Sequence, residues 1–142
     1  MAAMVEKWVK PFILWTLGGC IYFGIELAWR GYSHPAMVAV GGLCFLIVGG
    51  INEIFPWDLG FLWQCLIGGA AITAVELVSG LILNVWLGLG IWDYSALPLN
   101  LFGQICAPFS AAWVLLSGVA ILLDDFLRWK LFNEEKPRYK LM

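Results

Sequence analysis

Two glutamates lie within stretches of sequence that are otherwise apolar. Glu26 stands near the end of the first such stretch, and Glu76 stands inside a later one. A charged side chain near the middle of a membrane costs at least about 2.5–3.5 kcal/mol, so it usually faces a partner or a water-filled cavity. Arg30 follows Glu26 by four residues, on the same face of a helix. We expect these three residues to form the centre of a polar intramembrane site.

The sequence after Glu76 adds further polar groups to this site. One helix face carries polar and small residues at intervals of three or four: Gly69, Thr73, Glu76, Gly80 and Asn84. Such a face must contact protein or water rather than lipid. The loop that follows contains the densest polar stretch, Trp92-Asp93-Tyr94-Ser95. The predicted site comprises Glu26, Arg30, Glu76, Asn84, Asp93, Tyr94 and Asn100.

Two interpretations of these groups remain open. In the first, the glutamates line a path or pocket through the membrane; in the second, they hold helices together. A second cluster, of Asn52, Glu53 and Asp124, lies where two other apolar stretches end. For this cluster, ordinary charge at the membrane boundary is the favoured interpretation.

The chain lacks the residue patterns of enzymes and metal sites. Its single histidine, His34, stands beside a proline, and no nucleophile–base pair is visible. The cysteines Cys20, Cys44, Cys65 and Cys106 lie in or beside apolar stretches, without the spacing of metal ligands. We therefore predict no enzymatic activity, no catalytic residue, no metal and no cofactor. A net charge of −2, with only eight Lys and Arg residues, also excludes a nucleic-acid partner.

The composition is that of a membrane protein. Of the 142 residues, 62% are hydrophobic and 13% are charged, whereas typical soluble domains have about 45–50% and about 25%. Four stretches reach the length of about 20 residues that crosses a bilayer as a helix. The predicted spans are residues 11–29, 36–55, 61–86 and 104–126, followed by a tail at 127–142. We predict an all-α fold, in which residues 1–142 form a single transmembrane domain: a four-helix bundle surrounded by membrane lipids.

The distribution of cations predicts the orientation of these spans. With four spans, both termini lie on one side of the membrane. That side carries Lys7, Lys10, Arg128, Lys130, Lys136, Arg138 and Lys140, and the other side carries only Arg30. Because Lys and Arg concentrate in cytoplasmic segments, we predict a multi-pass protein of the cell membrane with cytoplasmic N- and C-termini.

An internal repeat links the two glutamates. Residues 17–27 read LGGCIYFGIEL and residues 67–77 read IGGAAITAVEL, so two glycines and a Glu-Leu pair match at an offset of 50. Both copies enter the membrane in the same direction. We therefore expect two parallel-repeat helical hairpins related by a pseudo-two-fold axis along the membrane normal.

The polar residues also resemble those of a known bacterial family. The residues that carry the resemblance are Glu26, Asn52-Glu53, Glu76, Asn84, Trp92-Asp93-Tyr94-Ser95, Pro98, Asn100, Gly103 and Ile105-Cys106. With these, residues 11–130 are similar to the putative ABC-transporter type IV, or CmpB-like permease, family. The resemblance implies a permease subunit driven by a separate ATPase. This chain has no P-loop of its own.

Two functions follow as hypotheses. The first is a permease or transport component with a polar intramembrane site around the two glutamates. The alternative is a structural or helper membrane protein that does not transport, with a role in assembly or regulation or a holin-like role. Either could act as a homo-oligomer or with other membrane subunits.

Overall fold

Four long apolar helices form the body of the protein. The computed structural model describes residues 1–142. The long helices are α1 (Ala2–Arg30), α2 (Ala36–Gly49), α4 (Phe61–Gly80) and α5 (Ala107–Phe132). The short helix α3 (Ile51–Ile54) prolongs α2, and a π-helical segment, η1 (Leu81–Trp86), prolongs α4. With these extensions, all four helices are long and apolar enough to cross a membrane, which confirms the predicted all-α fold with four spans.

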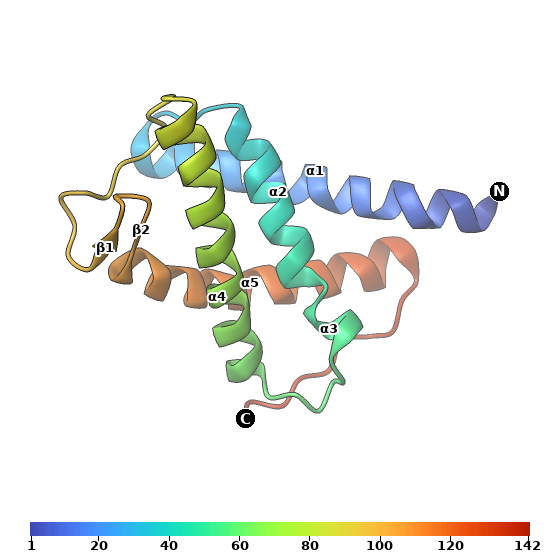
Figure 1. The fold of residues 1–142 in the computed structure, drawn as a ribbon. Helices are drawn as coiled ribbons and strands as arrows, with labels where there is room; N and C mark the ends of the chain where they lie inside the picture. Colours follow the sequence, from blue (N-terminus) through green and yellow to red (C-terminus); the bar gives the residue numbers. More distant parts are fainter.

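The helices pack as two crossing pairs. In Figure 1, α2 and α4 lie side by side and cross in front of α1 and α5. Helix α1 packs mainly on α2, and α4 mainly on α5, so each pair of consecutive spans forms a hairpin. The N-terminal end of α1 projects beyond the other helices (Figure 1).

Glycines allow the two helices of each hairpin to approach closely. A Cβ on Gly19 would overlap the carbonyl oxygen of Val38 in α2. In the second hairpin, a Cβ on Gly69 would overlap the side chain of Val114 in α5. Small residues at such contacts let helix backbones approach inside a membrane, where no hydrophobic effect drives helices together.

The ends of two helices differ from the ends of the predicted spans. Helix α1 begins at Ala2 and contains Pro11, because a helix can continue past the apolar stretch that spans the membrane. Helix α5 begins only at Ala107, since the residues before it pair in a two-stranded antiparallel sheet. Strand β1 (Asn100–Leu101) pairs there with β2 (Ile105–Cys106). At its other end α5 reaches Phe132, so the non-helical tail starts at Asn133.

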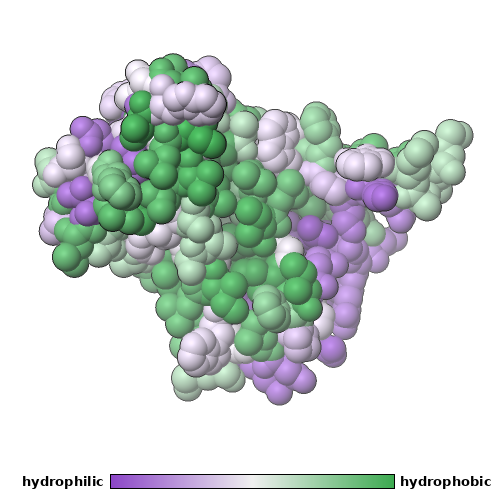
Figure 2. Space-filling model, viewed as in Figure 1, coloured by the Kyte–Doolittle hydropathy of each residue, from purple (hydrophilic) through white to green (hydrophobic).

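The surface of the bundle is largely apolar. Only 28 of the 142 residues are buried, so most of the hydrophobic side chains are exposed on the helices. Figure 2 shows hydrophobic residues over most of the visible face, with hydrophilic ones gathered near the end of α5 and the tail and on the loop that carries β1 and β2. This distribution suits helices that contact lipid along their length.

Candidate functional site

Glu76 of α4 is held by donors from two other parts of the chain. The hydroxyl of Tyr94, in the loop before β1, donates a hydrogen bond to Oε1 over 2.7 Å, and Nε1 of Trp113, in α5, donates to Oε2 over 2.7 Å. The side chain is 8% exposed. Burial and the nearby Glu76 carboxylate raise the pKa of Tyr94, so this hydroxyl remains a donor. Glu76 therefore connects α4, the loop and α5.

Glu26 of α1 has a different environment. It is 5% exposed, and neither of its carboxylate oxygens accepts a hydrogen bond. Its one charged partner is Arg30, with Nη1 lying 3.2 Å from Oε1. The same guanidinium donates from Nη2 to the carbonyl oxygen of Ile91 over 2.7 Å and lies over the ring of Tyr32. Arg30 thus holds the end of α1 to the loop and leaves Glu26 only partly compensated.

Both glutamates line one cavity between the four spans. The cavity has a volume of about 120 Å³ and is lined by 22 residues, of which 16 are hydrophobic. Of the residues predicted from the sequence, it brings together Glu26, Arg30, Glu76 and Tyr94. Its wall also includes the aromatic residues Tyr22, Trp92 and Trp113. We call Glu26, Arg30, Glu76, Tyr94 and Trp113 the cavity cluster.

Asn84 lies next to the cavity cluster without lining the cavity. Its Nδ2 donates to Oε1 of Gln104 over 2.8 Å, and its Oδ1 accepts from the backbone N–H of Ile91 over 2.7 Å. The indole of Trp92 donates to the backbone carbonyl of Gln104 over 3.0 Å. The two bonds of Asn84 join η1 to the loop. The π-helical segment lies beside the cavity, and such segments are frequent at functional sites. Asn84 supports the loop that carries Tyr94.

Asp93 and Asn100 build turns in the loop and do not line the cavity. Oδ1 of Asp93 accepts a hydrogen bond from the backbone N–H of Ser95 over 2.9 Å, which lowers the pKa of Asp93. Nδ2 of Asn100 donates to the carbonyl of Leu97 over 2.9 Å, and its Oδ1 accepts from the N–H of Gly103 over 3.1 Å. Such bonds from Asp and Asn side chains shape turns. Both residues therefore position the loop.

The second predicted cluster assembles around Arg128 of α5. Nε of Arg128 lies 2.7 Å from Oδ2 of Asp124, and Nη1 lies 3.6 Å from Glu53 and 3.7 Å from Glu134. Lys10 of α1 also pairs with Glu134. The structure therefore joins residues from four segments of the chain at this end of the bundle.

Asp125 extends this cluster to the C-terminal tail. Its Oδ2 accepts from Nδ2 of Asn52 over 2.6 Å and from the hydroxyl of Tyr139 over 2.7 Å. Burial and the hydrogen bond to the Asp125 carboxylate raise the pKa of Tyr139. We call the set of Asn52, Glu53, Asp124, Asp125, Arg128 and Tyr139 the Arg128 cluster.

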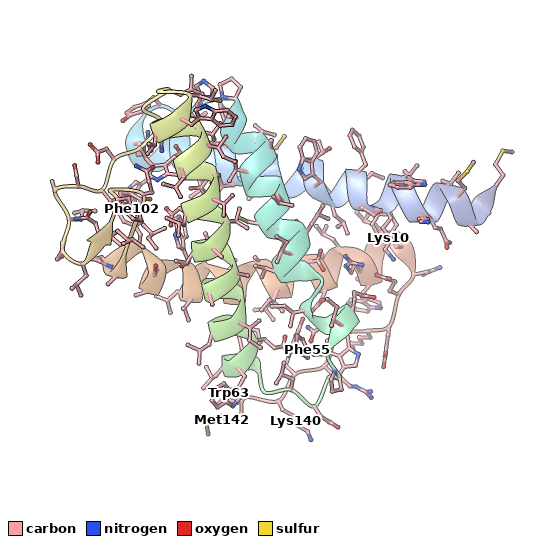
Figure 3. The ribbon with its side chains drawn as sticks, viewed as in Figure 1. Lys10, Phe55, Trp63, Phe102, Lys140 and Met142 are labelled. Carbon is pink, nitrogen blue, oxygen red and sulfur yellow. The ribbon has the colours of Figure 1, made fainter.

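The tail is held against the start of α4. The backbone N–H groups of Phe61 and Leu62 donate to the carbonyls of Lys140 and Leu141 over 2.6 and 3.1 Å. Figure 3 shows Lys140 and Met142 at this end of α4, with Met142 next to Trp63. The tail thus accepts from N–H groups in the first turn of α4, which have no partner within the helix.

Trp113 and Tyr139 belong to the two clusters, and the sequence did not single them out. Trp113 is 37 residues from Glu76 in the chain, and Tyr139 is 14 residues from Asp125. One general signal was available for Trp113, because an indole N–H inside a membrane usually requires an acceptor and few acceptors exist in the spans. Nothing in the sequence indicated which acceptor it would find.

Comparison with known proteins identifies the family of this chain. No curated protein and no solved structure matches it significantly. A family model described as "Putative ABC-transporter type IV" matches residues 13–138. This range includes most of α1, the other three long helices, the cavity cluster and every member of the Arg128 cluster except Tyr139. The chain therefore belongs to the putative ABC-transporter type IV family of membrane proteins.

Proposed function

We propose that this protein is the membrane-embedded component of a transport system and that the cavity between its spans is an intramembrane binding site. Membership of the putative ABC-transporter type IV family supports a transport role. A separate ATPase would be the energy-supplying partner, as the family description implies. The cavity supplies what a binding site requires: a partly enclosed space, mostly apolar walls and a few polar groups that converge on it.

The observation that carries this proposal is the state of Glu26. A buried carboxylate is normally paired and hydrogen-bonded, because removing a charge from water is costly. Glu26 has an ion-pair partner on one oxygen and no hydrogen bond on either. It lines a cavity that also contains a second glutamate. A group that is retained at such a cost inside a membrane is by default a functional one.

Native Cys44 gives a direct test, because it lines the same cavity. Replacing the cysteines at 20, 65 and 106 by serine leaves Cys44 as the only thiol. If the cavity is a site on a transport route, charged methanethiosulfonate reagents that do not cross lipid should modify Cys44 from one side of a proteoliposome. A second chain that keeps only Cys65, which is buried and outside the cavity, serves as the control.

The outcome depends on access as well as on thiol reactivity. The neutral, membrane-permeant methyl methanethiosulfonate should modify Cys44, which shows that the thiol is competent. If Cys44 resists both the neutral and the charged reagents, or resists the charged ones from both sides as Cys65 does, the transport proposal is wrong.

A structural role is the second candidate, and the environment of Glu76 favours it. Both oxygens of Glu76 accept hydrogen bonds, one from the loop and one from α5. This is the arrangement of a residue that holds helices together. Under this alternative, the protein would stabilise or assemble other membrane subunits, and Cys44 would be closed to charged reagents.

We also propose that both termini face the cytoplasm of the cell. Seven cations accompany the termini, and Arg30 is the only one on the opposite side. A cysteine introduced at Ala96 should then be labelled by an impermeant reagent from outside intact cells, and one at Asn133 only after permeabilisation. The reverse labelling pattern would refute the orientation.

A gene duplication is a further part of the proposal. The glycines Gly19 and Gly69, which match in the sequence, each contact the helix that follows their own, and the matching Glu26 and Glu76 line one cavity. We expect an experimental structure in a bilayer to superpose α1 on α4 by rotation about the membrane normal, with the two glutamates within about one helical turn, roughly 5 Å, in depth. Glutamates in opposite halves of the membrane would contradict it.

A further inference from the structure

We propose that the cavity binds a small organic monocation with an apolar body, and that its charged group lies between Glu26 and Glu76. This inference rests on the proposed function, because it names the class of ligand for the same site. It follows from three properties of the cavity: its charge, the chemistry of its walls and its volume.

The charged groups of the cavity sum to one negative charge when all are ionised. Glu26 and Glu76 contribute one each, and Arg30 is the only cation in the wall. Arg30 is also engaged elsewhere, since it donates to the carbonyl of Ile91 and lies over Tyr32. One positive charge on a ligand would balance the site, whereas an anion would face two carboxylates.

Glu26 has a carboxylate whose charge is only partly compensated, and an organic cation could balance it whether or not the cation carries N–H donors. Glu26 is 5% exposed, and no hydrogen bond of normal geometry reaches either oxygen, although the Tyr22 hydroxyl lies near the carboxylate. The oxygens of Glu76, by contrast, already accept from Tyr94 and Trp113. An ammonium group could therefore bind Glu26 directly and interact with Glu76 through charge alone.

The walls favour an organic cation over a metal ion. Hydrophobic residues make up 16 of the 22 that line the cavity, and they include aromatic rings from three segments, Tyr22, Trp92 and Trp113. Hard cations require six or more oxygen ligands, and the protein has no group of three His, Cys, Asp or Glu side chains placed to hold a metal. Aromatic faces, in contrast, attract alkylammonium groups.

The volume limits the size of the ligand. A cavity of about 150 Å³ in another protein accommodates benzene, which has six non-hydrogen atoms. The present cavity of about 120 Å³ therefore fits a ligand of about five to seven non-hydrogen atoms. Tetramethylammonium and choline are suitable probes of this size and charge.

The first experiment measures binding of these probes to the full chain in lipid nanodiscs. Choline is compared with 3,3-dimethylbutan-1-ol, its uncharged isostere, and with sodium ions at equal concentration. The thermal transition and the intrinsic tryptophan fluorescence, to which Trp92 and Trp113 of the cavity wall contribute, report binding. We expect saturable binding of choline and tetramethylammonium, with the isostere and sodium at least tenfold weaker. Equal binding of choline and its isostere, or no binding of either cation, would overturn the proposal without the need for any variant.

Variants then locate the binding site. Glu26→Gln and Glu76→Gln should each weaken choline binding at least tenfold. Glu53→Gln is the matched control, because it removes the same charge from a membrane helix away from the cavity. Loss of binding in the control as well, or none in either cavity variant, would place the bound cation elsewhere.

Thiol modification distinguishes failure of this inference from failure of the proposed function. In the chain that keeps only Cys44, the rates of the trimethylammonium-ethyl and sulfonate-ethyl reagents are each divided by the rate with a small free thiol. The corrected rate of the cationic reagent should be at least tenfold higher than that of the anionic one, and choline should protect the thiol. Equal corrected rates for the two reagents would refute the cation preference and leave an accessible transport site. Absence of reaction with both, while the neutral reagent reacts, would refute the transport site itself.

Discussion

The two buried polar clusters of this protein use charge in different ways. In the Arg128 cluster, the side chains are packed against one another: Asp124 is fully buried, and a Cβ on Gly49 would overlap its carboxylate. In the cavity cluster, Glu26 faces a space of about 120 Å³. None of the residues around Arg128 lines that space.

The partners of the acids differ as well. Asp124 pairs with Arg128 over 2.7 Å, and Asp125 accepts from Asn52 and Tyr139. Glu26 has one ion pair at 3.2 Å and no hydrogen bond. The comparison teaches that burial of a carboxylate does not by itself indicate a binding site. A binding site is indicated when a buried carboxylate has unused acceptor capacity and lies beside an open volume. The following predictions test this contrast.

The largest effect is expected at the centre of the Arg128 cluster. Asp124→Ala leaves the buried Arg128 without its closest partner, and breaking one side of a buried ion pair costs about 3–5 kcal/mol. Asp58→Ala is the control, because Asp58 is exposed and pairs only with Lys140. Denaturant unfolding in detergent micelles should show the difference in the free energy of unfolding. Equal stability of the two variants would mean that this cluster is not structural.

Packing gives the second contrast. Gly49→Ala places a methyl group against the Asp124 carboxylate and should destabilise the protein by about 1–3 kcal/mol. Gly24→Ala is the matched control, since no atom lies within 4 Å of the added Cβ.

In the cavity wall, Ala120→Val should change the free energy of unfolding by less than about 1 kcal/mol, because space is present. A larger cost for Ala120→Val than for Gly49→Ala would reverse the assignment of open and closed clusters.

The two glutamates should respond differently to the same change. Glu76→Gln puts an amide N–H₂ opposite one of two donors, Tyr94 or Trp113, and should cost about 1–3 kcal/mol of stability. Glu26→Gln removes an ion pair but also the cost of keeping a charge buried, and Arg30 keeps its contacts with the Ile91 carbonyl and the Tyr32 ring. Its cost should therefore be smaller, about 1 kcal/mol or less. Thermal unfolding of both variants checks this order. If Glu26→Gln is the more destabilising of the two, Glu26 is a structural residue.

The smallest effect is expected where the tail meets the Arg128 cluster. Tyr139→Phe removes the hydrogen bond to Asp125 and should cost about 1 kcal/mol. Tyr32→Phe is the control, because Tyr32 is exposed and lies just after the C-terminal end of α1; this change should cost almost nothing. Both are measured by denaturant unfolding at pH 7.

The Tyr139 contribution should also depend on pH in one direction. The pKa of Tyr139 is raised in the folded protein, so the folded state keeps this proton at pH values where the unfolded chain loses it. The parent protein should have a higher free energy of unfolding than Tyr139→Phe. This difference should be fully present below the ordinary tyrosine pKa of about 10 and should decline above it. A difference that grows above pH 10 would contradict the hydrogen bond.

Much of this architecture followed from the sequence, because its causes are local. Hydropathy along the chain determined four membrane spans and thus the fold class, since a helix in lipid satisfies its own backbone hydrogen bonds. The pairs Glu26–Arg30 and Asp124–Arg128 are separated by four residues, so helix geometry alone brings them together. The same holds for the turns made by Asp93 and Asn100, which bond to residues within five positions.

Only the tertiary structure decided which of these groups share a site. Trp113 and Tyr94 reach Glu76 from 37 and 18 residues away, and Arg30 reaches the carbonyl of Ile91 from 61 residues away. The cavity exists because α1, α2, α4 and α5 pack around the space that both glutamates line, and their close approach depends on glycine contacts between helices. Periodicity gives the face on which a side chain lies, but not the helix that this face will meet, because that choice minimises packing free energy over the whole chain. The sequence thus determined the spans and their polar residues, and the packing of the spans determined that one cluster is closed and the other open.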